Sequence, residues 1–351
     1  MSAREIKYGE AILEATRQMM LSDDRVMLMG LGVSDPGGIF GTTKGLFDEF
    51  GPDRVVETPT AENGVMGIAI GSSLVGMKPI ITHQRVEFSL LSYEQIVNQA
   101  AKWNYMTAGK KSVPIVVRLI IGRGWGQGPQ HSQSLEPIFA HVPGLKVIAP
   151  SSPSDAKGLL AAAINDPNPV VMLEHRWLHQ TYGEVSPDLY QQEIGRSKIV
   201  RAGTDITIVT YSYMVIEALR AARELANVGV SAEVIDLTSL RPLDFTTIEK
   251  SIGKTGRLLT IDNGWSTYGI GAEIVARAAT DCFDALQKPP IRLGVADVPI
   301  PSTRALADLV YPGFNNIVDS VSSILGRDLS RLKQKAICVE DVPDKSFTGP
   351  F

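Results

Sequence analysis

Cysteine is nearly absent from this sequence. Only Cys282 and Cys338 occur, which is too few for a disulfide framework, and neither stands in a CxxC pair or a Cys/His metal pattern. The histidines show no spacing with carboxylates that is typical of a zinc site. These shortages argue against a secreted disulfide scaffold and a structural zinc protein. We expect inert thiols in a reducing compartment and a cytoplasmic location.

Long apolar runs and clusters of basic residues are also missing. No apolar run approaches the roughly 20 residues that a membrane helix needs. The net charge is −4, and no lysine or arginine cluster offers an electrostatic footprint for nucleic acid or an anionic membrane. The first residues do not have the pattern of a signal peptide. We therefore expect small-molecule or protein partners, with no nucleic acid and no membrane.

Common catalytic signatures are absent as well, including HExxH, GxSxG and the phosphate-binding Walker pattern. A glycine-rich run from Gly122 to Gln133 follows a strand, but it lacks the GxGxxG spacing of a dinucleotide site. We interpret it as a loop that delivers His131 to the carboxyl edge of a parallel sheet, where sites gather. A histidine that only bonds to the backbone would explain the same residues equally well.

What the sequence does contain is an alternation of apolar strands and amphipathic helices, which predicts an α/β fold with parallel sheets. With 351 residues the chain exceeds the roughly 250–300 residues of a single core, so we expect two domains. The predicted divisions are a first domain at 1–183, a linker at 184–205, a second domain at 206–340 and a C-terminal arm at 341–351.

The predicted elements are assigned from the period of their apolar residues. In the first domain the strands are 26–30, 79–82, 115–119, 147–149 and 170–173, and the helices are 7–21, 62–76, 90–108 and 154–164. In the second domain the strands are 206–211, 232–236, 258–262 and 291–295, and the helices are 213–227, 246–252, 269–283 and 315–325.

The helix predicted at 62–76 consists almost wholly of small and apolar residues, so we expect it to be buried on nearly every side. Gly64, Gly67 and Gly71 each cost roughly 1 kcal/mol relative to alanine, which close packing of another backbone would offset. This pattern predicts a domain or subunit interface with Glu62 at its mouth. A carboxyl group there would be desolvated and suited to exchanging a proton. Alternatively, Glu62 merely favours the helix dipole.

Ordered motifs along nearly the whole chain resemble one enzyme family. In the first half they are Thr58-Pro-Thr-Ala-Glu62-Asn-Gly, Gln95-Ile-Val-Asn-Gln-Ala-Ala-Lys102, Val113-Pro-Ile-Val-Val-Arg118, Gln130-His-Ser-Gln133, Pro143-Gly-Leu-Lys-Val147, Asp155-Ala-Lys-Gly158 and Asn168-Pro-Val-Val171. In the second half they are Asp236-Leu-Thr-Ser-Leu-Arg-Pro-Leu-Asp244, Asp262-Asn-Gly-Trp265, Gly269-Ile-Gly-Ala-Glu273 and Ala296-Asp-Val-Pro299. The sequence thus resembles the β subunit of the thiamine-diphosphate-dependent first component of 2-oxo acid dehydrogenase complexes, a family that includes pyruvate, branched-chain and acetoin dehydrogenases.

This resemblance implies a thiamine-diphosphate pyrimidine-binding domain followed by a transketolase C-terminal-type domain. It implies that Glu62 bonds to a ring nitrogen of the cofactor's aminopyrimidine and that Phe88 packs on that ring, with Gln84 as a further cofactor contact. It assigns His131 to acyl transfer onto a lipoyl carrier. The substrate would be a 2-oxo acid or an acetoin-like ketone.

The resemblance also implies partners and metals. The Gly-Asp-Gly signature that binds the diphosphate and Mg²⁺ is absent here, because in this family a separate α subunit carries it. An α2β2 heterotetramer is the implied assembly, and a lipoyl acyltransferase is a further implied partner. Backbone carbonyls would hold a structural K⁺ ion at Ile115, Ala163, Ile164, Asp166 and Asn168.

Two segments depart from the family pattern. Thr82-His-Gln-Arg85 stands where relatives carry an acidic residue and apolar residues, and Leu119-Ile-Ile121 stands where many have a small residue and a proline. Both would lie near the substrate channel, so the substrate and the acceptor stay open. The alternatives are the C-terminal half of a split transketolase and a non-catalytic paralogue that binds an α-like partner.

Overall fold

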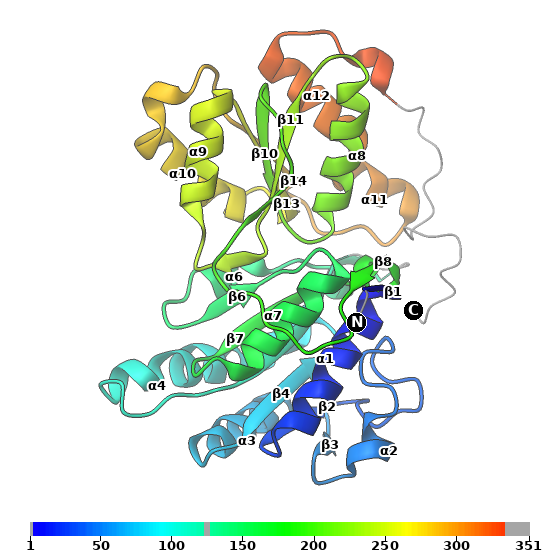
Figure 1. Ribbon diagram of the computed structural model, residues 1–351, viewed down its shortest axis with the longest axis vertical. Coiled ribbons are helices and arrows are strands. Elements are labelled where there is room, and N and C mark those ends of the chain that lie inside the picture. The colour runs from blue at the N-terminus through cyan, green and yellow to red at the C-terminus, as the bar shows by residue number, and fades with distance from the viewer. Residues whose placement is uncertain (1–2, 123–126, 334–351) are drawn as a thin grey trace. The chain divides into compact units, whose positions relative to one another are not determined.

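The computed structural model describes residues 3–122 and 127–333 (Figure 1). The described residues form two compact units. The first contains residues 3–121 and 138–194, and the second contains 122, 127–137 and 195–333. The segment that carries His131 therefore groups with the second unit, although it stands within the stretch predicted as the first domain. Residues 123–126 of the glycine-rich run, Cys338 and the C-terminal arm lie outside the described residues.

A parallel sheet forms the centre of the first unit. Its strands lie in the order β6-β7-β5-β4-β2-β3, and every neighbouring pair is parallel. The strands are β2 (Val26–Gly30), β3 (Val55–Glu57), β4 (Lys78–His83), β5 (Val116–Ile121), β6 (Lys146–Ile148) and β7 (Val170–His175). Strands β4, β5 and β7 are buried along nearly their whole length, which explains their continuous apolar runs.

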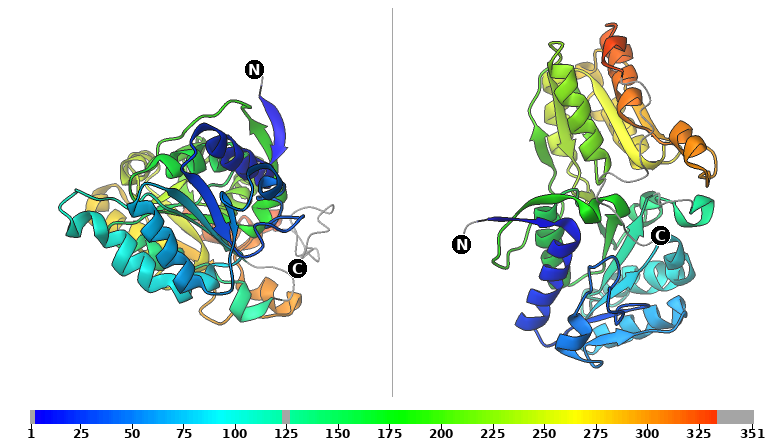
Figure 2. Two further views of the ribbon diagram at one scale, coloured as in Figure 1. Left: turned by 90° about the horizontal axis from the view of Figure 1, so that it is seen from below. Right: turned by 90° about the vertical axis from the view of Figure 1, so that its right-hand side faces the viewer.

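Helices cover both faces of this sheet (Figure 2). Helix α1 (Tyr8–Ser22) packs against α7 (Pro153–Asn165) on one face, and α3 (Glu62–Leu74) lies with α4 (Ala101–Met106) on the other. Ser152 caps α7 by accepting a hydrogen bond from the backbone N–H of Asp155, as a residue in that position does. The remaining elements are short: β1 (Arg4–Lys7), β8 (Tyr182–Val185), α2 (Leu46–Phe50), α6 (Glu136–Ala140), and the 3₁₀ segments η1 (Val86–Ser92) and η3 (Arg176–Gln180).

The second unit has its own sheet, in the order β14-β13-β10-β11-β9. Its strands are β9 (Lys198–Arg201), β10 (Ile206–Thr210), β11 (Ala232–Asp236), β13 (Leu258–Trp265) and β14 (Ile291–Val295). The unit also contains the short strand β12 (Ser239–Arg241), which does not belong to this sheet. Helices α8 (Met214–Ala226) and α12 (Phe314–Leu325) share one core on one face, and α9 (Phe245–Thr255) lies with α10 (Ile270–Asp281) on the other (Figure 1). The short elements are α5 (Gly128–His131), η4 (Phe283–Ala285), α11 (Arg304–Val310) and η5 (Ser330–Leu332).

The α/β class and the parallel sheets are confirmed, and the structure adds two antiparallel pairs. Strand β9 runs antiparallel to β11 at a sheet edge, inside the stretch predicted as a linker, and β1 pairs antiparallel with β8. The helix predicted at 90–108 is divided into η1, a π-helical segment η2 (Gln95–Ala100) and α4. No helix within the described ranges is both long and apolar enough to span a membrane.

Helix α3 differs from its prediction in one respect. Val65, Met66, Ala69, Ile70 and Ser73 are buried, but the opposite face is exposed, and the side chain of Ile68 is 63% exposed. The prediction of burial on nearly every side is therefore wrong for the single chain. The reason is that no second layer of described residues covers the glycine face of α3: among them, a Cβ atom added at Gly64, Gly67 or Gly71 would meet nothing within 4 Å.

Candidate active site

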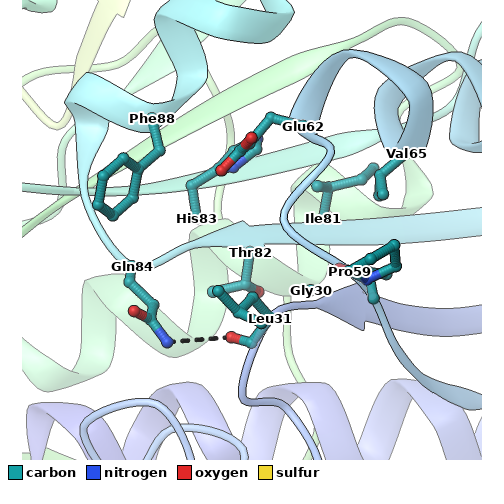
Figure 3. Close-up of a pocket in the computed structure, with 11 residues that line it drawn as sticks. Gly30, Leu31, Pro59, Glu62, Val65, Ile81, Thr82, His83, Gln84 and Phe88 are labelled. Atoms are coloured by element: carbon teal, nitrogen blue, oxygen red, sulfur yellow. Dashed lines mark hydrogen bonds between the residues drawn. The ribbon is translucent and has the colours of Figure 1, made fainter.

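A pocket opens at the carboxyl edge of the first unit's sheet, where ligand sites of parallel α/β sheets gather (Figure 3). It encloses about 370 Å³, part of it open to solvent. Residues from the ends of β2 and β4, the segment before α3, α3 itself and η1 line it: Gly30, Leu31, Thr58, Pro59, Glu62, Val65, Ile81, Thr82, His83, Gln84 and Phe88.

The predicted residues Glu62, Gln84 and Phe88 all line this one pocket. Glu62 is the first residue of α3, where the positive end of the helix dipole favours a carboxylate. Phe88 is half-buried on η1, and in Figure 3 its side chain and those of Glu62 and His83 lie on the same side of β4. Gln84 donates from Nε2 to the carbonyl of Leu31 at 3.1 Å. The pocket thus combines one carboxyl group with an aromatic ring and an amide.

Two buried polar atoms in the pocket have no hydrogen-bond partner in the described part of the chain. They are Oγ1 of Thr82 and Nε2 of His83, and the two side chains are 2% and 6% exposed. Burial lowers the pKa of His83 to about 4, so its imidazole is neutral at physiological pH. A buried polar atom without a partner costs about 1–3 kcal/mol. These atoms therefore indicate a pocket whose polar wall is completed by a ligand.

The start of the loop after β2 is fixed by a carboxylate, Glu57, that no sequence motif marks. Glu57 accepts hydrogen bonds from the backbone N–H groups of Gly32 (2.6 Å) and Ser34 (3.0 Å) and from Oγ of Ser34 (2.8 Å). Burial alone would raise the pKa of Glu57, but these hydrogen bonds outweigh it and lower the pKa. At the same rim Gly30 is required by space, because a Cβ there would lie 2.6 Å from the carbonyl oxygen of Thr82.

The fifth strand carries a buried ion pair close to the same edge. Arg118 donates from Nε and Nη2 to the two carboxylate oxygens of Glu174, at 2.6 and 2.9 Å, and from Nη2 to Thr42. His179 bonds to Glu174 at 3.2 Å. Burial would raise the pKa of Glu174, but Arg118 and His179 lower it to about 2. In the sequence Arg118 stands out only as part of a motif, because its partner lies 56 residues away.

His131 belongs to the second unit, where it ends the short helix α5. The residues after it are held through their backbone carbonyls: Tyr311 Oη donates to the carbonyl of Ser132 at 3.1 Å, and the N–H of Gly122 donates to the carbonyl of Gln133 at 3.1 Å. The imidazole is half-buried. Hydrogen bonds therefore hold the segment directly after His131 in place.

Glu136, five residues after His131, and Asp262 form a buried acidic pair. Glu136 is fully buried, and neither of its carboxyl oxygens has a hydrogen-bond partner among the described residues. Asp262 accepts from Tyr211 Oη (3.2 Å) and from the N–H of Gly271 (3.0 Å) at the start of α10. Burial raises the pKa of Glu136 to about 8, with the Asp262 charge adding to the rise, and burial raises the pKa of Asp262 to about 7. Glu136 is therefore protonated at neutral pH.

This arrangement predicts a stability that decreases with pH. Between the usual pKa of an exposed glutamate and about pH 8, the unfolded chain releases the Glu136 proton and the folded chain keeps it, so the free energy of unfolding falls. We expect Glu136→Gln to be more stable than the wild type at pH 8.5 by roughly 4 kcal/mol, with a small difference at pH 5. Urea unfolding at both values measures this. The exposed Glu249→Gln is the control, and an equal effect at both pH values would contradict the expectation.

The residues predicted to hold a K⁺ ion lie around the end of α7 and the start of β5 and β7. The carbonyl of Ile115 accepts from the N–H of Val170 (3.0 Å), and that of Ala163 accepts from the N–H of Asp166 (3.2 Å). The side chain of Asp166 also accepts from the N–H of Asn168 and pairs with Lys146. Whether an ion binds these carbonyls stays a prediction. No group of three or more His, Cys, Asp or Glu side chains within the described ranges is arranged to hold a metal.

Comparisons with known proteins agree with this arrangement. The domain family described as transketolase, pyrimidine binding domain, matches residues 4–180, and the family described as transketolase, C-terminal domain, matches residues 195–317. A solved structure described as a split gene transketolase, inactive beta4 tetramer, has a TM-score of 0.75 at 23% identity and covers 92% of this chain and 98% of its own. At that identity the likeness establishes the fold alone.

Curated relatives are more similar in sequence. The β-2 subunit of the mitochondrial pyruvate dehydrogenase E1 component from rice is 44% identical over 321 residues, which is 90% of this chain and 85% of the relative. The corresponding β subunit from Caenorhabditis elegans is 44% identical over 92% of this chain and 94% of its own, and that from Saccharomyces cerevisiae is 42% identical over 92% and 90%.

These relatives correct one prediction. The expected cytoplasmic location is wrong, because the relatives from rice, Arabidopsis thaliana, Caenorhabditis elegans, pea and yeast are all described as mitochondrial. Scarcity of cysteine indicates only that disulfides are not needed, and that condition does not separate the cytoplasm from other reducing compartments.

The two domain matches and the extent of the curated similarity lead to one conclusion: this chain belongs to the transketolase-like family of pyruvate dehydrogenase E1 component β subunits.

Proposed function

We propose that this chain is the β subunit of a thiamine-diphosphate-dependent 2-oxo acid dehydrogenase that acts together with an α subunit. The enzyme would decarboxylate a 2-oxo acid, or cleave an acetoin-like ketone, and transfer the acyl unit to a lipoyl carrier. The observation that carries the proposal is the pocket in which Glu62, Phe88 and Gln84 come together at the carboxyl edge of the sheet. The split-transketolase alternative has weaker support, since that solved structure shares 23% identity with this chain and the curated E1 β relatives share about twice as much.

The residues of the pocket fit the aminopyrimidine ring of thiamine diphosphate. Apolar side chains of Val65, Ile81 and Phe88 can cover a flat ring, and the unpartnered atoms of Thr82 and His83 can bond to its polar edge. Glu62, at the start of α3, would share a proton with a ring nitrogen. When bound, the cofactor supplies the electron sink that decarboxylation of a 2-oxo acid requires. In this proposal His131 assists acyl transfer, and the α subunit holds the diphosphate and Mg²⁺.

The exposed face of α3 supports the need for a partner. Three glycines in one helix weaken it by roughly 1 kcal/mol each relative to alanine, yet no atom of the residues that the structure describes fills the space they leave. Ile68 and Val75 add exposed apolar surface, at 63% and 82%. A second backbone packed on this face would account for both observations, and an α2β2 heterotetramer is the assembly that we propose.

A direct experiment tests the function. The chain would be co-expressed with its α-type partner and supplied with thiamine diphosphate and Mg²⁺, and release of carbon dioxide would be followed for a panel of 2-oxo acids, with acetoin cleavage assayed in parallel. Turnover of at least one substrate, and formation of an acylated lipoyl domain, is the expected result. An assembled, cofactor-loaded complex that turns over none of them would contradict the proposal and favour a non-catalytic paralogue.

The proposed K⁺ site leads to a further prediction. The last carbonyls of α7 carry the negative end of the helix dipole, and each has a second lone pair available after one hydrogen bond. We expect the melting temperature of the chain to fall by about 2–4 °C when KCl is replaced by tetramethylammonium chloride at equal ionic strength. Differential scanning calorimetry measures this shift. Equal melting temperatures in the two salts would contradict the proposed K⁺ site.

A further inference from the structure

His83 places an unsatisfied polar atom inside the pocket that contains Glu62. It is the last residue of strand β4, and its backbone is held in the sheet opposite Leu119 of β5. The side chain is 6% exposed, and its Nε2 atom has no hydrogen-bond partner among the described residues. Figure 3 shows the imidazole on the same side of β4 as Glu62 and Phe88. A rigid element therefore presents a buried ring nitrogen to the pocket.

Gln84, the next residue, adds a second polar group to the same wall. Its Nε2 donates to the carbonyl of Leu31 at 3.1 Å, and its amide oxygen points away from Leu31 (Figure 3). The loop below this amide is itself fixed, since the N–H of Gly32 donates to Glu57 at 2.6 Å. A Cβ at Gly32 would lie only 3.0 Å from Nε2 of Gln84. The amide is thus held in one orientation, with its oxygen left as an acceptor.

The two groups are uncharged, and this limits the chemistry of the ligand that complements them. Burial lowers the pKa of His83 to about 4, so the imidazole is neutral at physiological pH and has one nitrogen that donates and one that accepts. The amide oxygen of Gln84 only accepts, so a carboxylate or an oxo oxygen cannot satisfy it. A hydroxyl group both donates and accepts. It is therefore the group that can bond to either side chain.

The cofactor alone does not account for these two side chains. In the family pattern that the sequence resembles, an acidic residue and apolar residues stand along the segment Thr82–Arg85. A cofactor that the whole family shares does not require a histidine and a glutamine there. The pocket also encloses about 370 Å³, which is within the size range of sites for small molecules. The additional polar groups therefore indicate a feature of the substrate.

We propose that His83 is a specificity-determining residue whose Nε2 bonds to a hydroxyl group of the substrate, with Gln84 as a second contact. The inference rests on the proposed function and specifies its substrate class: a small 2-oxo acid or ketone that carries a hydroxyl group, as hydroxypyruvate and acetoin do. A plain aliphatic substrate would leave Nε2 of His83 buried without a partner. Sites that bond to a substrate hydroxyl discriminate strongly against an analogue that lacks it, for this reason.

The test compares matched substrates in the assembled, cofactor-loaded enzyme: hydroxypyruvate with pyruvate, and 4-hydroxy-2-oxobutyrate with 2-oxobutyrate. In at least one pair, kcat/KM should be about 10–100-fold higher for the hydroxylated member. His83→Phe keeps a flat ring without polar atoms and should bring this ratio close to unity. His83→Gln, whose amide can replace Nε2, should retain part of the ratio. His141→Phe, at an exposed histidine of the first unit, should keep the wild-type ratio.

Two measurements that do not depend on turnover accompany the kinetics. Isothermal titration calorimetry of the assembly with thiamine diphosphate and Mg²⁺ should give affinities within about threefold for the wild type and His83→Phe, because His83 contacts the substrate and not the cofactor. Differential scanning calorimetry of the free chain should show that His83→Phe melts about 2–4 °C higher, because a buried polar atom without a partner is gone.

Four results would overturn the inference. If kcat/KM for pyruvate and 2-oxobutyrate equals or exceeds that for their hydroxylated counterparts, the inference fails and the proposed function stands. If His83→Phe weakens thiamine diphosphate binding and leaves the substrate ratio unchanged, His83 is a cofactor contact. If the free His83→Phe chain melts lower and His83→Gln retains none of the ratio, His83 is a structural residue. If the loaded assembly turns over no 2-oxo acid and no acetoin, the proposed function fails together with the inference.

Discussion

Glu62→Gln is expected to reduce turnover of the assembled enzyme about 10²–10³-fold while leaving the fold and the assembly intact. The amide keeps the size of the carboxyl group and its place in the first turn of α3, but it cannot share a proton with a ring nitrogen. If Glu62 only favoured the helix dipole, the substitution would cost about 0.3–1 kcal/mol of stability and no activity. Steady-state kinetics and thermal unfolding of the same samples separate the two roles.

A matched control for this substitution is Glu5→Gln, at an exposed glutamate of β1 outside the pocket. It should retain wild-type turnover. Activity of Glu62→Gln within about threefold of the wild type would remove Glu62 from the chemistry, whatever its place in the pocket.

Gly67→Leu is expected to abolish assembly with the α-type partner without unfolding the chain. Among residues 3–122 and 127–333, nothing lies within 4 Å of a Cβ at this position, so a side chain can be added freely. Leucine also has a higher helix propensity than glycine, which should raise the free energy of unfolding by about 0.5–1 kcal/mol. In the proposed interface the same side chain would separate two closely packed backbones. Analytical ultracentrifugation of the mixed subunits, with urea unfolding of the free chain, measures both effects.

Gly253→Leu provides the comparison for this experiment. Gly253 lies in helix α9 of the second unit and is exposed, and a Cβ there also meets none of the described residues within 4 Å. This variant should assemble normally. A Gly67→Leu chain that forms the mixed complex as readily as Gly253→Leu would show that the glycine face of α3 is not the interface.

Most of the fold could be predicted from the sequence because buried parallel strands leave a strong local signal. Strands β2, β10, β11 and β14 lie within one residue of their predicted bounds, since each is a short apolar run between turn residues. Strands β1, β8 and β9 carry no comparable pattern. They are short, partly exposed edge elements, and their pairing depends on partners far along the chain.

The residues of the candidate site likewise differ in whether a local sequence pattern marks them. Glu62 could be predicted because a local pattern marks it, namely an acidic residue directly before a helix of small residues. Glu136, Glu57 and Arg118 have no such pattern, because their roles arise from burial and from partners that only folding brings close. The exposed face of α3 was missed for a different reason. A helix that is apolar all round predicts burial but not which molecule covers it.

The central claim is that Glu62 contributes to a thiamine diphosphate site shared between this chain and its α-type partner. Isothermal titration calorimetry tests it most directly, with thiamine diphosphate added to the free chain, to the mixed assembly, and to the assembly that carries Glu62→Gln. The account predicts Mg²⁺-dependent binding to the wild-type assembly, none to the free chain, and weakened binding in the variant. Equal binding to the free chain, or none to the assembly, would contradict it.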